Sequence, residues 1–247
     1  MKQADKLNDL ISQSQALVFL GGAGVSTESG IPDFRSESGL YSQHADLSPE
    51  IVLSHVFFNS NPEQFFDFYK KKIINLEAKP NPAHQRLAAL EAEGRLVAVI
   101  TQNIDGLHQQ AGSRKVIELH GSIYHNTCLD CHRKYDIGKI VESVSVPHCS
   151  CGGIIKPDVI LYGEALDPDV ITRAVKVLSE ADLLIIGGTS LAVYPAAGLI
   201  DYYQGKNLVI INSSPTPYDR QASLLIRQPI GQVLASIPGG FDLPRQL

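Results

Sequence analysis

Short runs of consecutive apolar residues recur along the chain, and each run ends in glycine or in polar residues. The runs cover residues 16–20, 96–100, 183–186 and 208–211. A strand with one face in solvent alternates apolar and polar residues, whereas a strand covered on both faces is apolar throughout, as in a parallel sheet. We therefore expect these runs to be buried parallel strands.

Helix signals lie between the apolar runs. Asn81-Pro82 and Asp167-Pro168 each place a capping residue before a proline, which suits the first position of a helix. Apolar residues then recur at helical spacing: Ala83, Leu87 and Leu90 after the first pair, and Val170, Ile171, Ala174, Val177 and Leu178 after the second. This alternation predicts an α/β fold with a doubly wound parallel sheet, which binds ligands at the carboxyl ends of its strands.

Two stretches interrupt the alternation. Residues 36–80 are polar and then rich in aromatic residues with helical character, and residues 123–156 contain every cysteine of the chain. We expect residues 1–35, 81–122 and 157–247 to form the main domain. The two interrupting stretches are expected to form a second, smaller domain over the edge of the sheet.

The composition is that of an ordinary globular protein, with 247 residues of which 44% are hydrophobic and 19% charged. A net charge of −5 and a single basic cluster, at residues 70–72, argue against a nucleic-acid partner. No apolar run approaches the roughly 20 residues of a membrane helix, and the first residues lack a secretory signal pattern. We expect a cytoplasmic protein without a membrane partner.

The four cysteines form two close pairs, Cys128 with Cys131 and Cys149 with Cys151. Paired cysteines in a cytoplasmic protein are typical of tetrahedral zinc coordination, here in a zinc-ribbon-like hairpin. Four thiolates would leave no open position, so the zinc would be structural. The second pair is spaced more tightly than usual, which leaves His148 as an alternative ligand, although we favour four sulfurs.

A glycine-rich turn, Gly21-Gly22-Ala23-Gly24, directly follows the first predicted strand. Such a turn brings backbone N–H groups against a pyrophosphate, although glycine-rich turns also serve packing alone. Thr27 replaces the third glycine of the dehydrogenase fingerprint, and no strand with an acidic end follows about 20 residues later. A hydride-transferring dehydrogenase is therefore disfavoured.

Polar residues also follow the other predicted strands. Gln102-Asn103-Ile104-Asp105 could hydrogen-bond a ribose and a carboxamide, although a capped turn uses the same residue types. Gly188-Thr189-Ser190 and Asn212-Ser213 could reach a phosphate or ribose, or act only as turn residues. His120, next to Gly121, suits a general base because the pKa of histidine is near neutrality, but it could equally be a structural histidine.

These motifs, in this order, resemble the core of the sirtuin family from about residue 10 to residue 235. The stretches that carry the resemblance are GAGVSTESGIPDFR, TQNIDGLH, ELHGS, the two cysteine pairs, KPDVILYGE, GGTSLAVYPA and INSSPTP. The resemblance is to compact bacterial members. It implies a Rossmann-like doubly wound sheet, with a small domain made from a helical insertion (residues 36–80) and a zinc-ribbon module (residues 123–156).

The resemblance further implies an NAD-dependent protein-lysine deacetylase that converts acyl-lysine and NAD to lysine, nicotinamide and O-acyl-ADP-ribose. His120 would be the catalytic base and Asn103 a second catalytic residue, with one structural zinc. The implied NAD-binding residues are Gly22, Ala23, Gly24, Thr27, Asp33, Phe34, Arg35, Gln102, Asn103, Ile104, Asp105, His120, Gly188, Thr189, Ser190, Asn212, Ser213 and Ile230. The implied contacts to an acetylated peptide or protein are Val159, Leu161, Gly163, Glu164 and Val193.

Two other functions remain open, namely mono-ADP-ribosyl transfer and a non-catalytic NAD-sensing module. The intact His120 favours deacylation over transfer, and the intact residues 102–105 favour an enzyme over a sensor. Relatives that prefer succinyl-lysine carry a Tyr-x-x-Arg pair beside the acyl pocket. Here Tyr69 and Lys72 would occupy those positions, and lysine cannot bind a carboxylate through two parallel hydrogen bonds. We therefore expect a preference for acetyl over succinyl groups.

Overall fold

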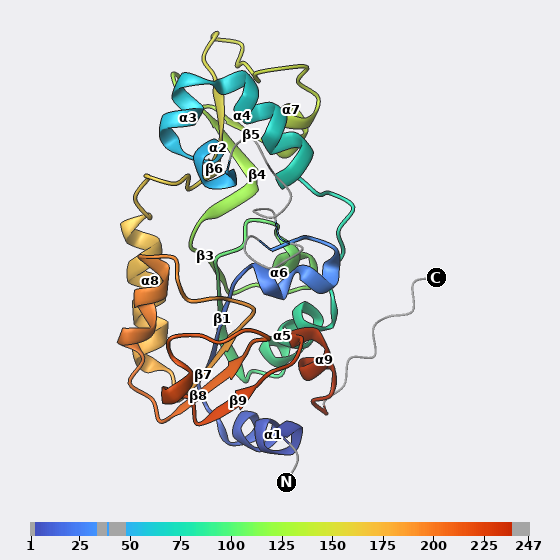
Figure 1. The fold of residues 1–247 in the computed structure, drawn as a ribbon, viewed down its shortest axis with the longest axis vertical. Helices are drawn as coiled ribbons and strands as arrows, with labels where there is room; N and C mark the ends of the chain where they lie inside the picture. The colour runs from blue at the N-terminus through green and yellow to red at the C-terminus, as the bar shows by residue number, and fades with distance from the viewer. Residues whose placement is uncertain (1–2, 34–38, 40–47, 239–247) are drawn as a thin grey trace.

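The computed structural model describes residues 3–33, 39 and 48–238, which form two lobes (Figure 1). The larger lobe is built on a six-stranded sheet of order β3-β2-β1-β7-β8-β9, in which all neighbouring strands are parallel. The strands are β1 (Leu17–Gly21), β2 (Leu96–Thr101), β3 (Val116–Glu118), β7 (Leu183–Gly187), β8 (Asn207–Ile211) and β9 (Leu224–Ile226). The four strands predicted from apolar runs are confirmed, and so is the parallel sheet.

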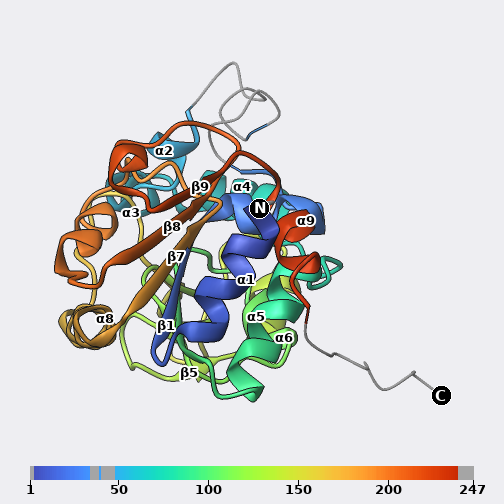
Figure 2. The same ribbon diagram turned by 90° about the horizontal axis from the view of Figure 1, so that it is seen from below.

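Helices cover both faces of this sheet (Figure 2). One face carries α1 (Gln3–Gln13), α5 (Pro82–Ala92) and α9 (Ile230–Ala235), and the other carries α8 (Pro168–Glu180) and the 3₁₀ helix η5 (Ala196–Tyr202). Along β1, Leu17 and Phe19 pack into the first core while Val18 and Leu20 pack into the second. Burial on both faces explains why the strands are apolar throughout.

Both predicted helix starts are confirmed. The side chain of Asn81 accepts a hydrogen bond from the backbone N–H of Ala83, and that of Asp167 accepts from Asp169 and Val170. These side chains satisfy N–H groups that have no partner within the helix. The remaining short elements of the larger lobe are α6 (Leu107–Gln110) and the 3₁₀ helices η1 (Ala23–Val25), η2 (Thr27–Ser29) and η6 (Asp219–Gln221).

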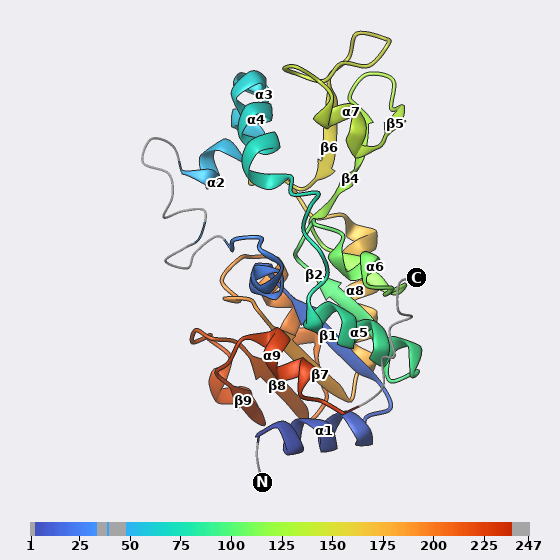
Figure 3. The ribbon, with the colours of Figure 1, turned by 90° about the vertical axis from the view of Figure 1, so that its right-hand side faces the viewer.

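The smaller lobe combines both insertions (Figure 3). The first supplies α2 (Pro49–Val52), α3 (His55–Ser60), α4 (Pro62–Phe68) and a π-helical turn, η4 (Tyr69–Ile73). The second lies within an antiparallel sheet of order β5-β4-β6, made of β4 (Gly121–Cys128), β5 (Lys134–Tyr135) and β6 (Ile155–Val159), with helix α7 (Ile137–Val141). Aromatic side chains of α4 and residues of this sheet share one hydrophobic core.

The predicted boundaries between the domains stay a prediction, and two of them (122/123 and 156/157) fall inside β4 and β6. The chain leaves the larger lobe through β4, which begins at Gly121, and returns to it through β6, which ends at Val159. These two strands therefore join the lobes directly. Among the described helices, none combines the length and apolar character that a membrane span requires.

Candidate active site

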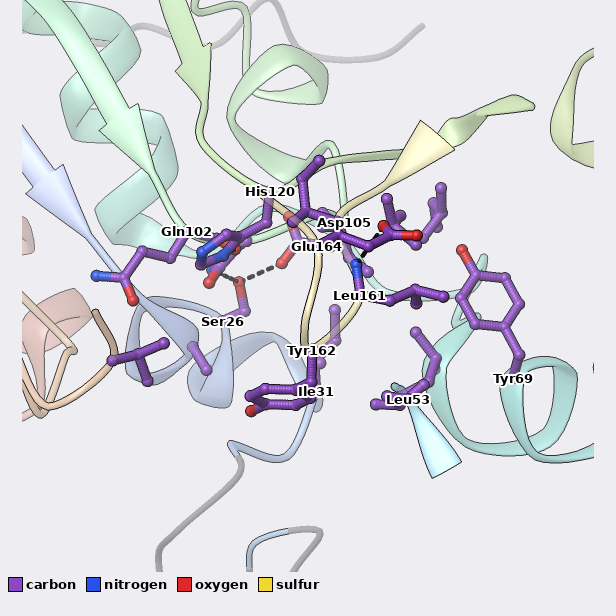
Figure 4. Close-up of a pocket in the computed structure, with 18 of the residues that line it drawn as sticks. Ser26, Ile31, Leu53, Tyr69, Gln102, Asp105, His120, Leu161, Tyr162 and Glu164 are labelled. Atoms are coloured by element: carbon purple, nitrogen blue, oxygen red, sulfur yellow. Dashed lines mark hydrogen bonds between the residues drawn. The ribbon is translucent and has the colours of Figure 1, made fainter. Parts of the chain in front are cut away.

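A pocket lies between the two lobes, at the carboxyl ends of β1 and β2 (Figure 4). The larger lobe contributes polar residues to its lining, and the smaller lobe contributes mainly apolar ones. The predicted site residues that line it together are Ala23, Gln102, Asn103, Ile104, Asp105, His120, Val159, Leu161, Gly163, Glu164 and Val193. The fold thus brings together segments that are far apart in the sequence.

Ser26 links two of these polar residues. Its hydroxyl Oγ accepts a hydrogen bond from Asn103 Nδ2 at 3.0 Å and donates one to Asp105 Oδ2 at 2.6 Å. The other carboxylate oxygen of Asp105 accepts from the backbone N–H of Leu107 at 2.9 Å. Burial raises the pKa of Asp105, and these hydrogen bonds oppose the increase. The network fixes the side chains of Asn103 and Asp105 at the pocket wall.

Ser26 was not among the predicted site residues. The available signal was its position two residues after the glycine-rich turn that follows the first strand. Ser26 is almost completely buried, with 1% of its surface exposed. A small hydroxyl that both accepts and donates can connect two strand ends that a longer side chain would push apart.

His120 occupies the same pocket. Its Nδ1 atom lies 2.9 Å from the carbonyl oxygen of Gln102, and a carbonyl oxygen can only accept, so Nδ1 carries a hydrogen. In the neutral ring the Nε2 atom is then the proton acceptor. Burial lowers the pKa of His120, against an opposing contribution from this hydrogen bond. The imidazole is therefore held neutral, in one tautomer, beside the Ser26 network.

The glycine-rich turn packs tightly against the end of β7. The backbone N–H of Gly24 donates to the carbonyl of Gly188 at 2.8 Å, and a Cβ atom on Gly24 would lie 2.8 Å from the Cα of Gly188. Gly188 itself has a φ of 58°, in the left-handed region. Packing between the two loops therefore requires glycine at positions 24 and 188, with or without a bound ligand.

The other predicted cofactor residues lie on the neighbouring strand ends. Thr189 Oγ1 accepts from Gln102 Nε2 at 3.2 Å, and Thr27 Oγ1 donates to the Gly24 carbonyl at 3.0 Å. Asn212 Nδ2 donates to the Ser214 carbonyl, and Ile230 is 3% exposed within the core. The described pocket does not include Gly22, Gly24, Thr27, Asp33, Gly188, Thr189, Ser190, Asn212, Ser213 or Ile230. Phe34 and Arg35 lie outside the described residues.

Glu164 organises the turn that follows β6. Its carboxylate accepts from the backbone N–H of Leu161 at 2.9 Å and lies 3.1 Å from Lys156 Nζ and 2.9 Å from His55 Nδ1. Burial raises the pKa of Glu164, but the hydrogen bonds from Leu161 and His55 and the charge of Lys156 outweigh it, so the pKa is lowered. The Leu161 carbonyl accepts from the Glu164 N–H, so both backbone groups of Leu161 are already bonded.

The apolar part of the pocket comes from residues that were not predicted as site residues. Its lining includes Ile31, Leu53, Ile73, Ile123 and Tyr162. An apolar residue of a pocket and one of a core have the same sequence signature, so only the fold separates them. Tyr69 and Lys72 also line the pocket, Tyr69 with no exposed surface and Lys72 as an exposed residue.

The four cysteine sulfurs lie within 4.8 Å of one another. Cys128 and Cys151 are 3.5 Å apart at their Sγ atoms, as are Cys131 and Cys149. Tetrahedral zinc with Zn–S bonds of about 2.3 Å requires sulfurs about 3.8 Å apart, so the cluster fits this ion. The Nδ1 atom of His148 lies 2.9 Å from the Gly152 carbonyl, and His148 is not part of the cluster. The four sulfurs are therefore positioned to hold one zinc ion, in line with the predicted ligand set.

The chain is similar to known proteins over nearly its whole length. The chain is 55% identical over 240 residues to an NAD-dependent protein deacetylase of Clostridium acetobutylicum, covering 94% of this chain and 98% of that protein. It is 57% identical over 237 residues to a protein of the same description from Clostridium perfringens, covering 94% of this chain and 97% of that protein.

Solved structures of Sir2 proteins have the same fold. A complex of Sir2 with a p53 peptide and NAD⁺ matches with a TM-score of 0.84 and 45% identity, over 95% of this chain and 96% of that chain. A complex with deacetylated p53 peptide and 3′-O-acetyl ADP ribose matches with a TM-score of 0.88 and 42% identity, over 96% and 97%. The family profile described as Sir2 family matches residues 22–195. This chain therefore belongs to the Sir2 family, the sirtuins.

Proposed function

We propose that this sirtuin is an NAD-dependent protein-lysine deacetylase that acts on acetylated proteins and peptides. The observation that carries the proposal is the neutral imidazole of His120, held beside the Ser26, Asn103 and Asp105 network in one pocket. The two clostridial relatives described above are named for the same activity. NAD would supply a ribose carbon that accepts the acyl oxygen as nicotinamide leaves. A neighbouring ribose hydroxyl would then attack the acyl carbon, and a water molecule would release the lysine amine. The products are lysine, nicotinamide and O-acyl-ADP-ribose.

The residues at the strand ends suit this cofactor. Amide and carboxylate side chains are appropriate partners for a carboxamide and for ribose hydroxyls, and Gln102, Asn103 and Asp105 place such groups in the pocket. Ser26 orients two of them in advance, which reduces the ordering cost of binding. In this proposal Asn103 and Asp105 hold the nicotinamide ribose, while Ala23, Thr189 and Ser190 lie towards the phosphates and the adenosine.

His120 acts as the general base in this proposal. Its Nε2 atom accepts a proton from a ribose hydroxyl, while the Nδ1 hydrogen bond to Gln102 keeps the ring in the required tautomer. A lowered pKa keeps Nε2 free to accept a proton at neutral pH. The metal plays no part in this role, because none of the four cysteines lines the described pocket.

The acylated peptide is proposed to enter along the turn after β6 and past Val193. The backbone groups of Leu161 are already bonded within the turn, so Leu161 contributes its side chain, and strand addition uses neighbouring backbone groups. The charged groups of Glu164 and Lys156 are paired and support the turn from within. Both lobes thus contribute to peptide binding.

A single assay tests the proposed function. The purified protein is incubated with an acetyl-lysine peptide and NAD, and the products are followed by mass spectrometry. Deacetylated peptide together with equimolar nicotinamide and O-acetyl-ADP-ribose is expected. A peptide that gains the mass of ADP-ribose would indicate ADP-ribosyl transfer, and NAD binding without turnover would indicate a sensor. We also propose a cytoplasmic location, because a cluster of reduced thiolates is maintained in a reducing compartment.

A further inference from the structure

The histidine at the start of helix α3 lies outside the pocket but contacts a residue that lines it. The Nδ1 atom of His55 lies 2.9 Å from Glu164 Oε1, and Glu164 lines the pocket whereas His55 does not. A carboxylate oxygen can only accept a hydrogen bond, so Nδ1 carries a hydrogen. The Nε2 atom of His55 lies 2.8 Å from Asn59 Nδ2 and accepts from it. Both ring nitrogens are thus bonded, which fixes the orientation of the imidazole.

The two oxygens of the Glu164 carboxylate have different partners. Oε1 accepts from His55. Oε2 accepts from the backbone N–H of Leu161 at 2.9 Å (Figure 4) and from Lys156 Nζ at 3.1 Å. The last torsion angle of a glutamate side chain has no sharp preference, so contacts on both oxygens are needed to fix the plane of the carboxylate. His55 therefore helps to direct Glu164 at Leu161, which also lines the pocket.

The backbone beside His55 pairs with the same turn after β6. The Tyr162 N–H donates to the Leu53 carbonyl at 3.0 Å, and the His55 N–H donates to the Tyr162 carbonyl at 2.9 Å, as in parallel strand pairing. The N–H of Ile160, in the same turn, donates to the His120 carbonyl at 2.9 Å. The turn is therefore bonded both to the first insertion and to the segment that carries His120.

The contact between His55 and Glu164 contributes little to the stability of the fold. The side chain of His55 is 52% exposed, and contacts between exposed groups stabilise a protein weakly because water competes for them. The side chains of Glu164 and Lys156 are only 18% and 17% exposed, so Glu164 stays in the turn without His55. Loss of the histidine should therefore change the position of the carboxylate more than the free energy of unfolding.

From these contacts we infer that His55 is a positioning residue for the acylated peptide. It holds the Glu164 carboxylate, and through it the Leu161 N–H, so that the turn after β6 is already arranged for the peptide strand. The first insertion thus takes part in recognising the peptide backbone as well as in forming the apolar wall. This inference rests on the proposed deacylase function and extends its machinery to a residue outside the pocket.

Two substitutions at His55 test the inference. His55→Leu removes the hydrogen-bond donor, whereas His55→Asn keeps an amide N–H near the position of Nδ1. His125→Leu, at an exposed histidine outside the described pocket, is the matched control. Binding of a fluorescently labelled acetyl-lysine peptide is measured by anisotropy without NAD, and the KM for NAD is measured by turnover.

The peptide Kd is expected to rise about threefold to tenfold in His55→Leu, the usual effect of losing one partly exposed hydrogen bond to a charged group. His55→Asn should recover most of this loss, and His125→Leu should bind as the unmodified protein does. The KM for NAD should stay within about twofold in all three variants, because His55 acts on the peptide side of the pocket.

Thermal unfolding separates positioning from a role in folding. His55→Leu should melt within about 2 °C of the unmodified protein. A much lower melting temperature, with peptide and NAD use weakened alike, would show a structural role and overturn the inference. Unchanged peptide binding in His55→Leu, or no recovery in His55→Asn, would overturn it as well.

The binding assay also separates this inference from the proposed function. Weaker peptide binding in His55→Leu, in a protein that releases no deacetylated product, would support the role of His55 and overturn the proposed activity. An unmodified protein that does not bind the acetylated peptide would overturn both.

Discussion

The imidazole rings of His84 and His108 pack edge to face in the interior, with their centroids 4.7 Å apart. His84 Nδ1 accepts a hydrogen bond from the Asn81 backbone N–H at the start of α5, so that nitrogen has to be unprotonated. Burial lowers the pKa of His84 to about 4 and that of His108 to about 3, with the charge of His84 contributing at His108. Both rings are therefore neutral in the folded protein.

This pair predicts a loss of stability in acid. Unfolded histidines bind a proton below about pH 6.5, whereas the folded ones do so only near their lowered pKa values. Stability should therefore be fully present above pH 6.5 and fall as the pH decreases towards 4. By pH 5 the loss of unfolding free energy is on the order of 2 kcal/mol for each ring and about 4 kcal/mol for the pair. Urea unfolding at a series of pH values measures this loss.

A variant isolates this effect from other acid-sensitive groups. His108→Leu should show a weaker dependence of the unfolding free energy on pH between 7 and 5. His125→Gln, at an exposed histidine, is the control and should follow the unmodified protein. Parallel curves for His108→Leu and the unmodified protein would contradict the prediction.

His120→Ala should lower deacetylation by about 10²–10⁴-fold, the usual cost of losing a general base. The fold and the metal content should remain, since His120 lines the pocket and is not part of the cysteine cluster. Because the pKa of His120 is lowered, kcat/KM of the unmodified protein should begin to decrease only below the usual range for histidine. Near-normal turnover in the variant would rule out His120 as the base.

Cys128→Ala or Cys151→Ala should lose the metal and lower the melting temperature, because a structural zinc contributes directly to folding. Metal content is measured by mass spectrometry of the native protein and stability by calorimetry. Ser150→Ala, between the second pair of cysteines, is the control and should retain the metal. Full activity and an unchanged melting temperature in a metal-free protein would contradict a structural role.

Asp105→Asn should weaken the use of NAD more than the binding of peptide. The substitution replaces the acceptor of the Ser26 hydrogen bond with a group that can present a donor, which disturbs Ser26 and, through it, Asn103. We expect a higher KM for NAD with a smaller change in the KM for peptide. Unchanged KM for NAD together with unchanged turnover would count against this role.

Acetyl groups should be removed at least about tenfold faster than succinyl groups in kcat/KM, or about 1.4 kcal/mol of discrimination. Lys72 lines the pocket as an exposed residue and would have to leave water to pair with a succinyl carboxylate. Matched acetyl- and succinyl-lysine peptides at saturating NAD measure the ratio. Equal or faster removal of succinyl would show that Lys72 binds the carboxylate.

The elements that could be predicted from the sequence are those with a strong local signal. The apolar runs identified four strands, and Asn81-Pro82 and Asp167-Pro168 identified two helix starts. Strands β3 and β9 were missed because three residues are too few to produce a pattern.

The parts of the site that were missed depend on tertiary structure. Ser26 matters because its hydroxyl joins the loop after β1 to the loop after β2. Leu53 matters because the fold places it in the wall of the pocket. Neither relationship has a local signature. The tight contact of Gly24 with Gly188 likewise joins residues that only the fold brings together.

The two lobes contribute different kinds of residue to the pocket. The polar side chains come before the sheet of the smaller lobe or lie where that sheet joins the larger lobe, and they are Ser26, Gln102, Asn103, Asp105 and His120. The helical segment α4 and η4 contributes to the apolar wall. Substitutions in η4 can therefore change the shape of the apolar wall without moving these polar side chains. Because the wall and the polar residues lie on separate segments, substitutions in the wall can change which acyl group is accepted and leave the reaction unchanged.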